Sequence, residues 1–264
     1  MLDAPPNQAA GLLDFAVPQT PRLTAMVSHG DENAELPLLL RVCAALVGFG
    51  YMVTVLDGSV LETSENPGLE QLLNFALPSR DHGDAPGWNI MPAGLGLQSL
   101  SAAHEHGGPS IADCGSFFPN EGIVIAYASA QCLTPLLQGS RVRPLLPISG
   151  AKTSLLTSYL ALKRLLLKAK VEPTVVNVVG AEQPELPGPA SWTSLSDCAK
   201  FFLNYEVTPL QIPLPSGNER YNAGISRLSL GLLETAMPLE SGWAHHASQR
   251  NRQSFSMPMA AGSH

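Results

Sequence analysis

The alternation of apolar and polar positions near the start of the chain predicts a strand, a loop, a helix and a second strand. Apolar residues 22–27 and 52–57 predict the two strands, and residues 36–49 form an apolar segment of helix length. A polar turn, residues 28–33, precedes the predicted helix. A βαβ unit of this size implies parallel strands joined by a right-handed crossover. The turn before the helix therefore lies where other proteins hold phosphate on the free N–H groups of a helix N-terminus.

The rest of the chain continues this alternation of short strands and helices. Residues 119–139 are apolar throughout and fit either one long helix or a helix plus a strand. Pro144 and Pro147 favour an irregular or edge position for the strand that contains them. The other expected strands are 88–91, 110–115, 143–148, 173–179 and 208–213, and the expected helices are 67–77, 154–170, 195–202 and 220–236.

These elements predict the fold class α/β, with a three-layer α/β/α arrangement around a mostly parallel sheet of about seven strands. We place this domain at residues 22–239. Residues 1–21 form an N-terminal segment and linker between proline clusters, and residues 240–264, rich in Ser, His, Gln, Ala and Gly, read as a disordered tail.

Composition narrows the function classes. The chain has 264 residues, of which 45% are hydrophobic and 14% charged, and its net charge of −7 disfavours nucleic-acid binding. Its four cysteines are widely spaced and lack the spacing of zinc ligands, which indicates thiols in a reducing compartment and no metal site. Without a long apolar run or a charged leader, the chain is expected in the cytoplasm.

The first 60 residues resemble the opening of MinD/ParA-type ATPases, whose deviant P-loop precedes an apolar helix that ends in glycine and a strand that ends in aspartate. An ungapped alignment back from Gly50 and Asp57 places the family's signature lysine at Gly30, its phosphate-binding lysine at Glu35 and its magnesium-binding threonine at Leu36. The degenerate P-loop positions are thus Gly30, Asp31, Glu32, Asn33, Ala34, Glu35 and Leu36. Three carboxylates in this loop repel an anion by a few kcal/mol each, at roughly 4 Å. The resemblance therefore implies a deviant P-loop NTPase fold with no ATP hydrolysis and no nucleotide cofactor.

Three further positions match the family. Asp57 stands at the end of the second strand, Asp113 resembles the switch aspartate linked to magnesium and the attacking water, and Asn177 resembles the asparagine at the nucleotide base. An acidic group at the end of a strand also caps loops, so we interpret Asp113 as structural. Asn177 likewise fits a turn cap.

The N-terminal segment resembles the D-Q-A-x-x-L-R motif of the flagellar-number regulator FlhG, a MinD-like ATPase that stimulates the GTPase FlhF. The matching residues are Asn7, Gln8, Ala9 and Leu12, while both charged positions of the motif are lost. The resemblance implies that Gln8 contacts an FlhF-like GTPase. A disordered leader without a partner is the alternative.

These observations predict a pseudo-ATPase that acts through protein contacts in flagellar placement or number control, with recruitment to the cell pole implied by the resemblance. Because Gly30 replaces the signature lysine, we expect no ATP-dependent homodimer. The last helix has few cations, so membrane association is expected to be weak or absent. The alternatives are a MinD-like protein of cellulose secretion and a remodelled ATPase that still binds nucleotide.

Overall fold

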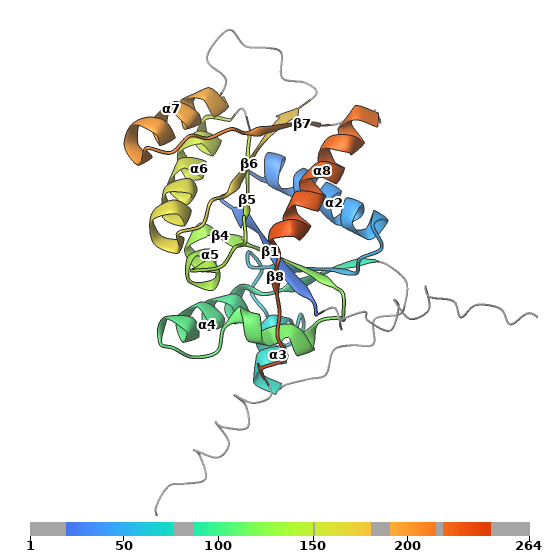
Figure 1. The fold of residues 1–264 in the computed structure, drawn as a ribbon. Helices are drawn as coiled ribbons and strands as arrows, with labels where there is room; N and C mark the ends of the chain where they lie inside the picture. Colours follow the sequence, from blue (N-terminus) through green and yellow to red (C-terminus); the bar gives the residue numbers. More distant parts are fainter. Residues whose placement is uncertain (1–19, 76–86, 150, 181–190, 215–218, 244–264) are drawn as a thin grey trace, which may run out of the picture.

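The structure is a computed structural model that describes residues 20–75, 87–149, 151–180, 191–214 and 219–243 (Figure 1). Its centre is an eight-stranded sheet in the order β3-β2-β4-β1-β5-β6-β7, with β8 paired to β1. The first seven strands are parallel, and β8 is antiparallel. The predicted parallel sheet of about seven strands is confirmed, and β8 adds a short strand that the sequence pattern did not reveal. The strands are β1 (Arg22–Ser28), β2 (Val53–Asp57), β3 (Trp88–Pro92), β4 (Ile123–Ser129), β5 (Leu145–Ile148), β6 (Thr174–Gly180), β7 (Leu210–Leu214) and β8 (Met237–Pro238).

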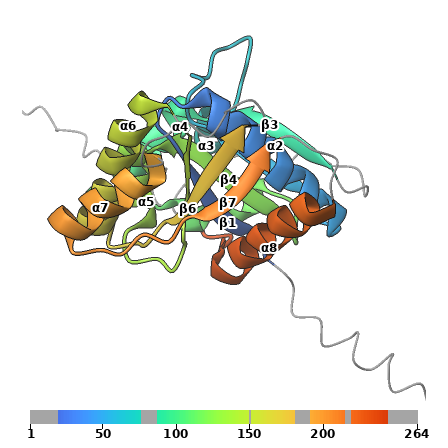
Figure 2. The same cartoon turned by 90° about the horizontal axis from the view of Figure 1, so that it is seen from above.

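Helices cover both faces of the sheet, as the three-layer prediction required (Figure 2). One face packs against α2 (Glu32–Gly48) and α8 (Glu219–Thr235). The other face packs against α3 (Leu69–Phe75), α4 (Gly94–Glu105), α5 (Ala130–Leu137), α6 (Lys152–Arg164) and α7 (Ser191–Leu203).

Successive residues of a strand point to opposite faces, and this alternation divides the core into two clusters. In β1, Leu23, Ala25 and Val27 belong to the cluster under α3 to α7, whereas Met26 belongs to the cluster under α2 and α8. All four side chains are buried. A strand that is apolar on both faces reads as a continuous hydrophobic run, which is how residues 22–27 appear in the sequence.

The strand predicted at 110–115 is wrong. Residues Ile111–Phe117 form the short 3-10 helix η1, because Ser110 and Asp113 make a capping box at its start. The apolar run 119–139 instead supplies a strand, β4, followed by α5. Of the two arrangements that the sequence left open, the structure therefore has the helix plus a strand, with the strand first.

The edge position suggested for the proline-containing strand is also wrong. β5 lies between β1 and β6, and Pro147 pairs in register with Val176 of β6. The described pairing of β5 with β1 is the single bridge between Met26 and Leu145. Pro147 has no N–H group and therefore cannot donate a hydrogen bond to a neighbouring strand.

The packed domain continues past the predicted boundary at residue 239. Trp243 is 9% exposed, stacks edge-on against Phe117 and donates a hydrogen bond from Nε1 to the carbonyl of Leu73. The rest of the predicted tail, residues 244–264, and the N-terminal residues 1–19 lie outside the described part of the chain.

Candidate functional site

The loop in the P-loop position joins β1 to α2 and consists of His29, Gly30 and Asp31. It is shorter than the predicted turn, because α2 begins at Glu32 and not at Leu36. Gly30 has φ = 89°, a left-handed backbone conformation that favours glycine, and a Cβ at this position would meet no atom within 4 Å. A glycine is therefore favoured here by the backbone conformation of the turn and not by a lack of space for a side chain.

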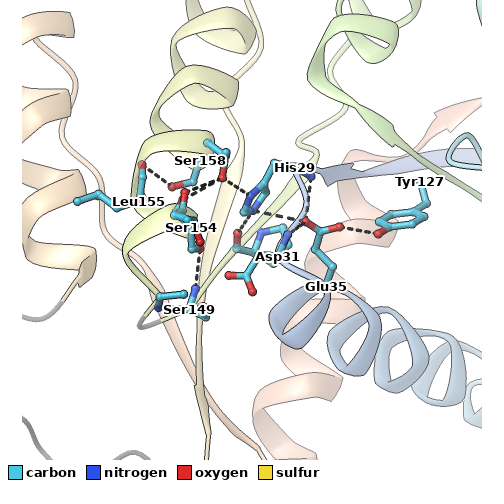
Figure 3. Close-up of polar contacts among 12 residues, drawn as sticks. His29, Asp31, Glu35, Tyr127, Ser149, Ser154, Leu155 and Ser158 are labelled. Atoms are coloured by element: carbon cyan, nitrogen blue, oxygen red, sulfur yellow. Dashed lines mark hydrogen bonds and ion pairs between the residues drawn. The ribbon is translucent and has the colours of Figure 1, made fainter.

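Glu35 fills the centre of this loop with its own carboxylate (Figure 3). Its Oε1 accepts hydrogen bonds from the backbone N–H groups of His29, at 2.9 Å, and Asp31, at 2.8 Å. Its Oε2 accepts a hydrogen bond from the hydroxyl of Tyr127 on β4. The Glu35 side chain is completely buried. Free backbone N–H groups at the start of a helix can bind an external anion or a side chain of the same chain, and here the carboxylate of Glu35 occupies them.

His29 attaches the loop to the neighbouring β5 and α6. Its Nε2 lies 2.6 Å from the carbonyl of Pro147 and its Nδ1 lies 2.9 Å from the hydroxyl of Thr157. Because a carbonyl can only accept, Nε2 carries the proton of that hydrogen bond. The same Nε2 lies 3.8 Å from Oε1 of Glu35, and both side chains are nearly inaccessible to solvent.

The electrostatics of the loop are unfavourable for a phosphate. Asp31 is 7% exposed and its Oδ2 has no hydrogen-bond partner among the described residues, while its backbone N–H already binds Glu35.

Burial raises the pKa of Tyr127, and the hydrogen bond to Glu35 raises it further. Tyr127 therefore stays a neutral donor to the Glu35 carboxylate at ordinary pH.

Ala34 and Leu36 supply no side-chain ligand for phosphate or magnesium, because both side chains are apolar. Ala34 is buried, and Leu36, in the place of the magnesium-binding threonine, is 43% exposed. Glu32 and Asn33 lie in the first turn of α2, and their side chains lie outside the described atoms.

Two of the three matched positions have internal partners of their own. Asp57 ends β2, and its Oδ1 accepts hydrogen bonds from the backbone N–H and the hydroxyl of Ser59. Asn177 is 9% exposed, and its amide donates to Oε1 of Gln211 on β7, at 2.7 Å. This sheet contact replaces the turn cap that the sequence suggested for Asn177.

Asp113 does not reach the loop at all. Its Oδ2 accepts hydrogen bonds from the N–H and the hydroxyl of Ser110, which confirms its interpretation as a structural cap. Gly115, two residues after Asp113, donates its N–H to the carbonyl of Glu240, which lies two residues after β8, and β8 pairs with the first residues of β1. Asp113 therefore lies at the amino edge of the sheet, whereas Glu35 lies at the carboxyl edge. At that carboxyl edge, β4 ends in Ser129 and carries no acidic residue there.

His29 and Tyr127 are the residues of this site that sequence reasoning missed. His29 stands within the turn that was singled out, next to Gly30. Tyr127 carries a hydroxyl inside the apolar run 119–139, and such a group requires a partner when it is buried. The need of a buried hydroxyl for a hydrogen-bond partner is the one feature of the sequence that could have indicated Tyr127. The matched N-terminal residues Asn7, Gln8, Ala9 and Leu12 lie outside the described residues.

Three of the four cysteines have thiols whose pKa is raised by burial. Burial raises the pKa of Cys43 to about 12 and that of Cys132 to about 11, and it also raises the pKa of Cys114. In the described residues, no three His, Cys, Asp or Glu side chains are grouped so that they could hold a metal ion. No described helix is both long and apolar enough to cross a bilayer.

Comparison with solved structures identifies the fold. Cobyrinic acid a,c-diamide synthase from Mycobacterium smegmatis, with bound ADP and magnesium, matches with a TM-score of 0.51 at 14% identity, over 92% of this chain and 100% of that one. This chain has the MinD/ParA-type P-loop NTPase fold. At such identity the similarity establishes the fold alone.

Two further structures with this P-loop NTPase fold match less closely. The MinC:MinD cell division protein complex from Aquifex aeolicus has a TM-score of 0.43 at 14% identity, over 90% of this chain and 98% of that one. A ParA family ATPase from Chlorobium tepidum has a TM-score of 0.45 at 13% identity, over 82% of this chain and 96% of that one. No protein-family model and no curated protein sequence matches this chain.

Proposed function

We propose that this chain is a pseudo-ATPase of the MinD/ParA fold that acts through protein contacts. The observation that carries the proposal is the buried carboxylate of Glu35, which takes the backbone N–H groups of His29 and Asp31. These are the donors with which a P-loop cradles phosphate oxygens. A nucleotide would have to displace Glu35 from three hydrogen bonds and then approach two acidic residues.

The residues at the matched family positions do not lie around one common phosphate position, and this supports the same proposal. Phosphoryl transfer needs a lysine, a magnesium ligand and a residue that positions the nucleophile, all around one phosphate. Here Glu35 and Leu36 stand where the lysine and the hydroxyl are required, and Asp113 lies at the opposite edge of the sheet. Asn177 is bonded to Gln211. Gly30 stands in the place of the signature lysine, so we also propose that the chain forms no ATP-dependent homodimer.

Flagellar placement or number control is the setting that we propose, with an FlhF-like GTPase as partner. The support is the N-terminal match at Asn7, Gln8, Ala9 and Leu12, which precedes a chain with the MinD/ParA fold. The amide of Gln8 is able to donate and to accept hydrogen bonds, as a residue that orients an attacking water must. The chain would act in the cytoplasm and be recruited to the cell pole.

Titration calorimetry with Mg-ATP tests the loss of nucleotide binding. We expect no heat of binding, and no rise in the melting temperature of the full chain at millimolar Mg-ATP. A binding-competent P-loop at a hundredfold excess over its dissociation constant would gain about 2.7 kcal/mol. Saturable binding of Mg-ATP that is lost in Leu36→Asp would contradict the proposal and favour the alternative of a remodelled protein that still binds nucleotide at this loop.

GTP turnover by the cognate FlhF-like protein tests the proposed partner. The rate is measured for the GTPase alone, with the full chain, and with the Gln8→Ala and Gln19→Ala variants. Because both charged positions of the motif are lost, we expect at most weak stimulation by the full chain and by Gln19→Ala, which changes a glutamine outside the matched motif. Any such stimulation should be lost with Gln8→Ala. Equal rates in all four reactions, together with no co-purification, would exclude this partner and favour the cellulose-secretion alternative.

A further inference from the structure

Strand β3 forms one edge of the sheet, and within the described residues only β2 pairs with it (Figure 2). The hydrogen bonds to β2 begin at the carbonyl of Gly87 and end at the N–H of Ala93. In a parallel ladder, every second residue bonds to the same neighbouring strand. The odd-numbered residues from 87 to 93 therefore bond to β2, whereas Trp88 and Ile90 direct their backbone N–H and C=O groups away from the sheet.

The side chains of Trp88 and Ile90 lie on the same face of the sheet. In the register of β2 and β3 they stand beside Val53 and Val55, which belong to the core cluster under α2 and α8. Trp88 is nevertheless 45% exposed and Ile90 is 52% exposed. The outer side of β3 thus combines free backbone donors and acceptors with two large apolar side chains.

Strand β3 lacks the features that usually protect a sheet edge. Natural proteins place charged residues or an interior proline on such a strand to prevent further strand pairing. No residue of β3 is charged, and its proline, Pro92, is the last residue of the strand. At the opposite edge of the sheet, β7 contains Pro213 before its last residue. Strand β3 is therefore the edge that is suited to accept another strand.

We propose that β3 pairs with β3 of a second copy of this chain, antiparallel and without any nucleotide. The two-fold axis passes beside Asn89, so that Trp88 of each copy lies opposite Ile90 of the other copy. In an antiparallel ladder, two such residues exchange both of their backbone hydrogen bonds. The outward N–H and C=O groups of Trp88 and Ile90 are thereby all paired, and Pro92, which has no N–H, ends the ladder.

The sequence of β3 favours a second copy as the occupant. Residues directly opposite each other in an antiparallel pair have their side chains on the same face, so Trp88 packs against Ile90 twice in the dimer. Such pairs of an aromatic and a β-branched residue stabilise a sheet. Each copy has a net charge of −7, but the pairing strands are uncharged and place no like charges opposite each other. A strand of another protein would have to supply the matching side chains itself.

This contact does not involve the loop around Glu35. Strand β3 lies at the lateral edge of the sheet, and three strands, β2, β4 and β1, connect it to that loop in the strand order. The dimer is therefore separate from the question of nucleotide binding. One strand from each copy makes a small interface, which is typical of a reversible dimer that depends on protein concentration.

Sedimentation velocity of the full chain, from low to high micromolar concentration, tests the proposal. We expect a shift from monomer to dimer with rising concentration, unchanged by Mg-ATP. Salt should favour the dimer, because it screens the repulsion between two acidic copies. Trp88→Glu and Ile90→Lys should each raise the dissociation constant at least about tenfold, since either substitution removes both cross-strand pairs.

Matched charges at other exposed positions are the controls. Leu230→Glu on α8 and Leu160→Lys on α6 introduce the same charges at side chains that are 50% and 55% exposed, and both variants should dimerise like the wild type. Circular dichroism melts confirm that each variant is folded. Only monomer at every concentration would overturn the proposal, and so would a dimer that forms only with Mg-ATP or that Trp88→Glu and Ile90→Lys leave intact.

An equimolar mixture of Trp88→Glu and Ile90→Lys tests the register. In the proposed pairing, the carboxylate introduced in one copy lies opposite the ammonium group introduced in the other. The second cross-strand pair of this heterodimer keeps its native tryptophan and isoleucine. We therefore expect the mixture to dimerise more tightly than either variant alone, and more so at low salt. A mixture that stays as monomeric as its components would overturn the antiparallel pairing on which the proposal rests.

Discussion

Tyr127 and Glu35 meet in the interior of the domain although 92 residues separate them in the sequence, and the tyrosine hydroxyl donates to the glutamate carboxylate. Tyr127 comes from β4, and Glu35 comes from the first turns of α2. Together with the N–H groups of His29 and Asp31, Tyr127 completes the set of donors around this one buried carboxylate. The arrangement resembles a P-loop in which a carboxylate of the same chain occupies the position of the bound anion.

Removal of that carboxylate should destabilise the protein strongly. Hydrogen bonds to a charged group contribute about 1.5–3 kcal/mol each, and an unpaired buried donor adds a penalty. We expect Glu35→Ala to lower the free energy of unfolding by at least about 3 kcal/mol, and Tyr127→Phe by about 1.5–3 kcal/mol. Urea denaturation measures both. Tyr159→Phe is the control, because the hydroxyl of Tyr159 forms no hydrogen bond within the described residues, and a loss equal to that of Tyr127→Phe would contradict the role of Glu35.

An external anion should partly replace the missing carboxylate. In Glu35→Ala the N–H groups of His29 and Asp31 become free at the start of α2, where the helix dipole favours an anion. We expect phosphate to raise the melting temperature of Glu35→Ala above its value in sodium chloride of the same ionic strength. Wild type and Tyr127→Phe keep the carboxylate and should show no such difference. An equal phosphate effect in all three proteins would mean that Glu35 does not occupy an anion site.

Much of the fold follows from the sequence because its elements have local signals. The strand at 22–27 and the helix of residues 154–170 were recognisable from apolar runs and periodicity. The structure has the strand as β1, and it has the helix as α6 followed by a π-helical turn, Leu165–Ala169. Residues 110–115 were misassigned because their apolar character outweighed the spacing of Ser110 and Asp113. That spacing is a helix-start signal, and the structure uses it as one.

The candidate site was predictable in position but not in arrangement. The loop and the acidic residue at position 35 followed from counting along one βαβ unit. The partners of the loop did not, because Thr157 lies 128 residues from His29 and Tyr127 lies 92 residues from Glu35. Such contacts depend on strand order, and the sheet places β4 and β5 on either side of β1.

Asp113 should matter for stability and not for any event at the loop. Its carboxylate caps η1, and loss of such a cap costs about 1 kcal/mol. We expect Asp113→Ala to lower the free energy of unfolding by this amount in urea denaturation, with no effect on the phosphate response of Glu35→Ala. Ser110→Ala removes the other half of the capping box, so the double variant should lose less than the sum of the two single losses. Full additivity would contradict the shared cap.

The free energy of unfolding should decrease at alkaline pH, in part through Cys43. Burial raises the pKa of this thiol from its ordinary value of 9.0 to about 12. Between these two values the unfolded chain loses the thiol proton while the folded chain keeps it, so the unfolded state is favoured as the pH rises. The contribution of the neutral thiol is therefore complete below pH 9 and decreases by about 1.4 kcal/mol per pH unit above it. Cys43→Ala lacks this titration.

We therefore expect the difference in unfolding free energy between wild type and Cys43→Ala to shrink as the pH rises above 9. At pH 8 the variant should be the less stable protein, because the substitution leaves a cavity beside fully packed neighbours of α2. Urea denaturation at several pH values measures the difference. Val42→Ala creates a cavity on the same helix without removing a titrating group, so its deficit should stay constant with pH. A Cys43→Ala deficit that is just as constant would show that the thiol of Cys43 ionises equally in the folded and unfolded states.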